Sequence, residues 1–279
     1  MENLDQKLKE LYAEIPWPSD PESEEGKKYF ERSIKSMETL VDHSWITELS
    51  GLRKIKVLEI CGGAGFGSIA LGKVLKGRNI DTEILITDLR SDSLENARNW
   101  GKKLGLNVET KVLDAREVYK IEDRFDIALM FGLSTPHFNP WDMVKILSSV
   151  SSVLNPDGIL AIEESDRRYR IFLNNSYKWV LGEGDENKLV LSIHSGYDIV
   201  KGVVKRTYVS LNFASKPLTM EMYMWGLAEL GALTWTFFED VDLIPLKREA
   251  RFFVIAHNPR KKPMDPSETP TILKNKEGA

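Results

Sequence analysis

A glycine-rich turn between Glu59 and Gly65 is the part of this 279-residue chain with the clearest chemical potential. The stretch reads "VLEICGGAGFGSIAL" and changes there from a short apolar run to a helical pattern. Glycine lets the backbone adopt positive φ and approach a ligand closely, and the amides that begin the next helix can bind polar ligand atoms. The turn therefore predicts a site for a ligand that contains a nucleotide or a carboxylate.

Two well-known ligand classes fit this turn less well. A triphosphate-binding loop needs a lysine followed by serine or threonine after its second glycine, and no such lysine is present. The dinucleotide pattern G-x-G-x-x-G, begun at Gly63 and Gly65, has Ser68 in place of its third glycine. Triphosphate binding is therefore not expected, and dinucleotide binding stays open as a weaker alternative.

Further polar residues follow later apolar runs. Asp88 ends "ILITDLR", Asp114 and Ala115 follow "VETKVL", and His137 lies in "MFGLSTPHFNP". A carboxylate can accept hydrogen bonds from two neighbouring hydroxyl groups, as a ribose presents them. Each aspartate alone could equally be a helix cap or a solvated loop charge. Their ordered placement after successive strands makes a common ligand site the stronger interpretation.

The elements that would position these residues alternate from Lys54 onward. Five short apolar runs ("IKVLEI", "TEILIT", "VETKVL", "FDIALMF" and "GILAIEE") alternate with helical patterns, which predicts an α/β fold with a parallel sheet covered on both faces. We expect a capping box of Asp92 and Glu95 to begin one helix, and Asn139 before Pro140 to begin another that stops at "NPDG". The polar residues above then lie at the carboxyl edge, where open parallel sheets bind ligands.

The rest of the chain predicts additions to this core. Residues 1–50 read as a helical cap, with a second helix from about Glu24 into the forties, and residues 51–258 as the main domain. An antiparallel hairpin is expected as an insertion at about 188–213, followed by a helix over 219–230. "ALTWTFFED" and "ARFFVIAHN" predict two closing strands, and residues 259–279 a flexible tail.

The order acidic, apolar, small, any, Gly, any, Gly at Glu59 to Gly65 resembles the first motif of the class I S-adenosylmethionine-dependent methyltransferases. The resemblance covers about Lys54 to Glu164; family members usually carry glycine where Cys61 stands. It implies S-adenosyl-L-methionine as cofactor and a doubly wound, mostly parallel seven-stranded sheet that ends in an antiparallel pair. It also implies these cofactor-binding residues: Glu59, Cys61, Gly63, Ala64 and Gly65 in the turn, Asp88 and Leu89 at the ribose, Asp114 and Ala115 at the adenine, and Phe131 and Leu133 at the methionine part.

The hairpin and the helical pattern after it resemble small-molecule methyltransferases of the glycine and sarcosine N-methyltransferase type. This implies a methyl acceptor that is a nitrogen or oxygen of a small metabolite. His137 and Glu163 are the candidate catalytic residues, since a protonated acceptor needs a base, although either could only orient the acceptor or serve the fold. Four aromatic residues of the cap could bind the substrate or shield a cation, or simply form the core of the cap: Tyr12, Trp17, Tyr29 and Phe30.

Composition limits the partners. The chain has 38 basic and 42 acidic residues, a net charge of −4 that does not favour nucleic acid as a partner. Its single cysteine allows no internal disulfide or cysteine metal cluster, no metal site is expected, and no apolar run is long enough for a membrane. The charged beginning of the chain favours a cytoplasmic location. The alternatives are a non-catalytic binder of S-adenosylmethionine or S-adenosylhomocysteine, and a methyltransferase acting on RNA or protein.

Overall fold

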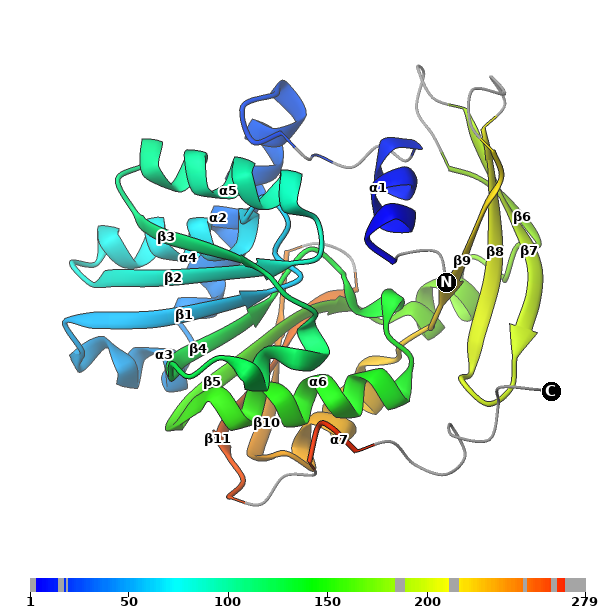
Figure 1. Cartoon of the computed structure of the whole chain (residues 1–279). Coiled ribbons are helices and arrows are strands. Elements are labelled where there is room, and N and C mark those ends of the chain that lie inside the picture. Colours follow the sequence, from blue (N-terminus) through cyan, green and yellow to red (C-terminus); the bar gives the residue numbers. More distant parts are fainter. Residues whose placement is uncertain are drawn as a thin grey trace.

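A seven-stranded sheet forms the centre of the computed structural model, which describes residues 4–14, 18, 20–183, 189–210, 216–247, 250–261 and 265–268 (Figure 1). The strands lie in the order β10-β11-β5-β4-β1-β2-β3. The five strands β1 to β5 pair in parallel, whereas β11 is antiparallel to both β5 and β10. Their bounds are β1 Lys54–Ile60, β2 Asp81–Asp88, β3 Asn107–Val112, β4 Phe125–Met130, β5 Leu154–Ser165, β10 Phe238–Pro245 and β11 Arg251–Pro259.

Helices cover both faces of this sheet, which gives three layers. On one face, α2 (Glu24–Val41), α4 (Phe66–Gly77) and α5 (Ser91–Lys103) contribute to one buried apolar cluster. On the other, α6 (Pro140–Val153) and α7 (Leu227–Trp235) contribute to a second. The short α3 (Ser44–Glu48) lies between α2 and β1 in the chain. The sheet core is thus shielded from water, and the strand ends remain available for a site.

A second sheet of four antiparallel strands lies beside the carboxyl edge of the first (Figure 1). Its order is β6-β7-β8-β9, with β6 Val180–Gly182, β7 Val190–Asp198, β8 Val203–Ser210 and β9 Leu218–Met222. Helix α1 (Leu4–Glu14) packs against it through a small cluster that contains Leu11, Tyr208 and Met220. The N-terminal helix and this sheet therefore stand over the strand ends of the main sheet.

The predicted α/β architecture is confirmed, including the seven strands and the antiparallel pair that closes the sheet. The structure adds β6 and β9 to the expected hairpin, so that the insertion is a full sheet. Asn139 caps α6 as expected, by accepting hydrogen bonds from the amides of Trp141 and Asp142. The division into a cap, a main domain and a tail remains a prediction.

Four local predictions were wrong. Residues 218–222 form a strand and not the beginning of a helix, because Met220 pairs with Arg206 of β8 and packs beside Leu11; the helix begins only after Gly226. The closing strand begins at Phe238, since the residues of "ALTW" still belong to α7. Arg90 and not Asp92 caps α5, and its side chain makes no capping bond. Strand β3 lies at the sheet edge and is largely exposed, so it is not covered on both faces.

Candidate active site

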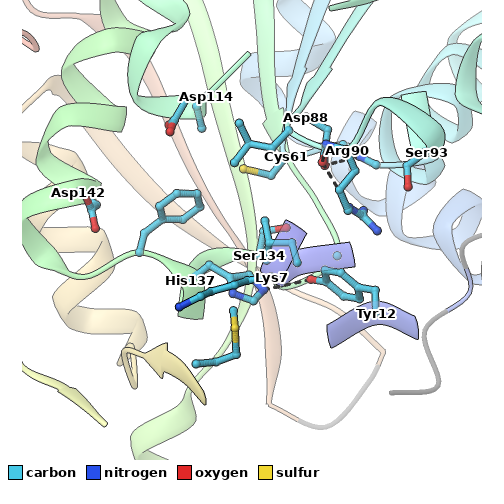
Figure 2. A pocket seen from close by; sticks show the side chains of 18 of the residues that line it. Lys7, Tyr12, Cys61, Asp88, Arg90, Ser93, Asp114, Ser134, His137 and Asp142 are labelled. Atoms are coloured by element: carbon cyan, nitrogen blue, oxygen red, sulfur yellow. Dashed lines mark hydrogen bonds and ion pairs between the residues drawn. The ribbon is translucent and has the colours of Figure 1, made fainter. Parts of the chain in front are cut away.

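A cavity of about 650 Å³ lies at the carboxyl ends of β1, β2, β3 and β4. Its volume is within the range of small-molecule sites. Residues of α1 and of the β8–β9 side of the second sheet also line it, so the cavity has walls on the side away from the strands. Figure 2 shows the side chains that face one another across it.

The glycine turn contributes the wall after β1. Three of its residues have positive φ: Cys61 at 54°, Gly63 at 50° and Gly65 at 77°. A Cβ atom on Gly63 would lie 2.6 Å from Nη2 of Arg90, so only glycine fits there without displacing that side chain. Cys61 is a non-glycine residue in the left-handed region, a conformation that carries strain and is common at functional sites.

Asp88 joins this turn to the end of β2. Its Oδ2 accepts a hydrogen bond from the Gly63 amide at 2.8 Å, and its Oδ1 accepts one from the Arg90 amide at 2.9 Å. The Arg90 guanidinium lies 3.4 Å from Oδ1 (Figure 2). An ionised carboxylate has about four lone-pair positions. Asp88 can therefore order the turn and still accept a ligand hydroxyl.

Asp114 lies after β3 in a charged group with Arg116 and Asp142. Arg116 donates to both oxygens of Asp114, at 3.0 and 2.6 Å, and to Asp142 at 2.9 Å. Burial opposes ionisation of Asp114, but the hydrogen bonds from Arg116 outweigh it and lower the pKa of the carboxyl. Asp114 therefore remains ionised at neutral pH and contributes a fixed negative charge to this end of the cavity.

Glu59 connects the end of β1 to the beginning of α4. Its Oε2 accepts hydrogen bonds from the amide and the hydroxyl of Ser68, in the first turn of α4. Burial raises the pKa of Glu59 to about 7, although the bonds from Ser68 oppose this. Glu59 lines the cavity, and its bonds to Ser68 hold the beginning of α4 in place.

Tyr12 and His137 close the side of the cavity opposite the sheet. The Tyr12 hydroxyl lies 3.0 Å from Nε2 of His137, and the Arg90 guanidinium lies 4.4 Å from the centre of the Tyr12 ring (Figure 2). Burial, together with the charges of Arg167 and Arg90, lowers the pKa of His137 to about 4. The imidazole is therefore neutral at physiological pH, and its buried Nδ1 has no hydrogen-bond partner within the described parts of the chain.

The structure brings most of the predicted site residues to this cavity. Tyr12, His137 and Tyr29 line it, and so do these predicted cofactor residues: Glu59, Cys61, Gly63, Ala64, Asp88, Leu89, Asp114, Ala115 and Phe131. Gly65 and Leu133 do not line it; Gly65 serves as the left-handed residue that caps α4. Phe30 packs in the core against Trp100, with ring centres 4.3 Å apart, and Trp17 lies outside the described residues.

Glu163 does not reach the cavity. One oxygen accepts a hydrogen bond from the Gly132 amide at 2.9 Å, and the other pairs with Arg251 at 3.0 Å. The residue is 1% exposed and is not among those that line the cavity. This geometry contradicts contact with an acceptor: Glu163 joins the loop after β4 to β11, so the carboxylate positions the wall of the site.

Two arginines at the site were not predicted from the sequence. Arg90 contacts Asp88 and the Tyr12 ring, and Arg116 holds Asp114. Each follows its aspartate by two residues, in "DLR" and "DAR". The repeated spacing was a usable signal, because an Asp side chain commonly bonds to the amide two residues further on.

The described residues lack two features. They contain no group of three or more His, Cys, Asp or Glu side chains placed to hold a metal ion. Within the same ranges, no helix has the length and apolar character needed to cross a membrane.

Comparisons with known proteins agree with this geometry. Residues 57–158 match a family model described as a methyltransferase domain. A glycine/sarcosine N-methyltransferase of Halorhodospira halochloris is 29% identical over 135 residues, which are 48% of this chain and 47% of that protein. The chain thus matches about half the length of this relative.

Solved structures show the same fold over most of the chain. The PH0226 protein of Pyrococcus horikoshii is 23% identical, with a TM-score of 0.61 over 90% of this chain and 99% of that one. A S-adenosylmethionine-dependent methyltransferase of Clostridium acetobutylicum is 13% identical, with a TM-score of 0.57 over 92% of this chain and 100% of that one. The family-model match and the relative support a class I S-adenosylmethionine-dependent methyltransferase, and the solved structures show its fold.

Proposed function

We propose that this chain transfers the methyl group of S-adenosylmethionine to a nitrogen or oxygen atom of a small metabolite. The observation that carries the proposal is the shape of the cavity, which runs from the glycine turn to His137 and is covered by α1 and β9. A covered site suits an acceptor that enters whole, whereas a site for RNA or protein needs an open groove. Exclusion of water also favours a displacement that depends on alignment of the reacting atoms.

The residues at the strand ends fit the cofactor. Asp88 would accept hydrogen bonds from the ribose hydroxyls, and Asp114 would accept one from the adenine amino group. The turn from Gly63 to Ala64 would approach the carboxylate-bearing part closely, as its positive φ and lack of side-chain bulk allow. When bound, S-adenosylmethionine supplies an electrophilic methyl group on a sulfonium.

His137 and Tyr12 would orient the acceptor and not remove its proton. A base with a pKa of about 4 is too weak to deprotonate an ammonium or an alcohol efficiently at neutral pH. A neutral imidazole can still hold the Tyr12 hydroxyl, which lies 3.0 Å from its Nε2, in a fixed position at the wall of the cavity. We therefore infer that the nucleophile binds in its neutral form. An amine of lowered pKa meets this condition most easily, because it is already unprotonated near neutral pH.

The relative from Halorhodospira halochloris supports the nitrogen alternative, because its name specifies glycine and sarcosine, which are small amines. Small amino acids and their N-methyl derivatives are therefore the acceptors to test first, followed by amines and hydroxyl compounds without a carboxylate.

The test is formation of S-adenosylhomocysteine by the purified chain with each acceptor class. We expect turnover with a small amine, and a loss of about tenfold or more in kcat/KM for His137→Asn, equivalent to one hydrogen bond of about 1.4 kcal/mol. His43→Asn is the matched control, since His43 lies away from the cavity and pairs with Asp242. Binding of the cofactor without turnover on any small acceptor would favour a non-catalytic binder, and turnover only on RNA or protein would refute the small-molecule proposal.

A further inference from the structure

A second cavity, of about 320 Å³, lies beside the four-stranded sheet and away from the site described above. The segment that follows β5, residues 165–178, forms one side of it, and β8 and β9 contribute the other. No residue that lines the first cavity lines this one. The second cavity is therefore a separate recess of the size of a small-molecule site.

Cations dominate the polar lining of this recess. Arg167, Arg170, Lys178 and Arg206 line it, against one carboxylate, Glu183. Of these cations, Arg167 lies 3.2 Å from an oxygen of Glu164, outside the recess. The other three have no carboxylate partner within the part of the chain that the structure describes. The guanidinium of Arg170 lies 3.4 Å from the hydroxyl of Ser165. Among the residues that the structure describes, the recess therefore carries more positive than negative charge.

Arg206 is the most informative of these cations, because it is only 2% exposed. Its guanidinium donates to the hydroxyl and carbonyl of Ser192, the hydroxyl of Tyr177 and the carbonyl of Lys178, all of which are neutral. These four bonds use four of the five N–H donors of arginine and leave one on Nη2. Burial of a cation without a counter-charge is costly, and the four bonds hold this one in a fixed position.

We propose that this recess binds a small oxyanion ligand, an organic phosphate or carboxylate. The anionic group would sit between Arg170, Lys178 and the remaining donor of Arg206, where it would supply the missing counter-charge. Guanidinium groups suit this role because their planar donors match the oxygens of phosphate and carboxylate. Met222 and Met224 form an apolar part of the lining, which suits a ligand with a short carbon body.

The first experiment is calorimetric titration of the whole chain with two probes, inorganic phosphate and citrate, in a buffer of low ionic strength. Tight binding of one probe over the other distinguishes a phosphate ligand from a carboxylate ligand. Arg170→Gln and Lys178→Gln are the variants of choice, since both side chains are exposed and neither supports the fold as Arg206 does. Arg32→Gln on α2 is the matched control, because it removes an equally exposed cation far from the recess.

We expect at least one probe to bind, with an affinity that falls tenfold or more in both recess variants and less than twofold in Arg32→Gln. Binding should persist in the presence of saturating S-adenosylmethionine, because the two cavities share no lining residue. No binding at about 10 mM probe, a Kd far weaker than ordinary metabolite sites, would overturn the proposal. Equal binding by the parent and both recess variants, or displacement by S-adenosylmethionine, would also overturn it. None of these results would bear on methyl transfer, which is measured separately.

Discussion

Replacement of Asp88 by asparagine should weaken cofactor binding strongly. The substitution keeps the size of the side chain and removes its charge, so the amides of Gly63 and Arg90 lose an ionised acceptor at 2.8 and 2.9 Å. Hydrogen bonds to charged groups contribute about 1.5–3 kcal/mol each. The loss of one such bond to a ribose hydroxyl corresponds to an increase of roughly 10- to 150-fold in Kd for S-adenosylmethionine.

The assay is calorimetric titration of parent, Asp88→Asn and Asp81→Asn, with chemical unfolding of each protein alongside. Asp81 is the matched control, since it begins the same strand, β2, and is exposed. The unliganded Asp88→Asn protein should also unfold more easily, by about 1–3 kcal/mol, because the turn loses its charged support. A Kd for Asp88→Asn within twofold of the parent value would refute the assignment of Asp88 to the cofactor.

Three further outcomes are expected. His137→Asn should remove a pH-dependent part of the stability. The folded pKa of about 4 lies below the usual 6.5, so the unfolded chain binds more protons between these two values. As pH rises from 4 to 6.5, the parent should therefore gain roughly 3 kcal/mol of unfolding free energy relative to the variant, measured by urea unfolding across that range. Glu59→Gln should show the opposite sign. Because the pKa of Glu59 is about 7 in the folded chain and 4.5 ordinarily, the parent should lose stability relative to the variant as pH rises from 4.5 to 7. If the difference in unfolding free energy between parent and variant is the same at pH 5 and pH 7, the raised pKa of Glu59 is contradicted. Glu163→Gln should cost about 3–5 kcal/mol of unfolding free energy by leaving Arg251 without its partner, and a loss of turnover at unchanged stability would instead favour a catalytic role for Glu163.

The sheet and the ends of its strands could be predicted because they depend on local patterns. Apolar runs, glycine positions and caps such as Asn139 act over a few residues, and they place Asp88, Asp114 and the glycine turn at one edge. The predicted cofactor residues accordingly line one cavity, with the exception of Gly65 and Leu133.

Contacts between distant parts of the chain could not be predicted from such patterns. Tyr12 and His137 are 125 residues apart in sequence, and their contact depends on how α1 packs against the second sheet. Glu163 lies near the end of an apolar strand, as a site carboxylate would. It instead forms a structural ion pair with Arg251, which lies on the neighbouring strand β11. Met220 has the sequence context of a helix and becomes part of β9 because β8 offers it backbone partners.

The central claim is that the cavity at the carboxyl edge binds S-adenosylmethionine. Calorimetric titration of the purified chain with S-adenosylmethionine, and separately with NAD, tests it most directly. We expect saturable binding of S-adenosylmethionine with a stoichiometry near one per chain, and no binding of NAD. Binding of NAD, or of neither ligand, would contradict the assignment of the glycine turn and with it the proposed methyl transfer.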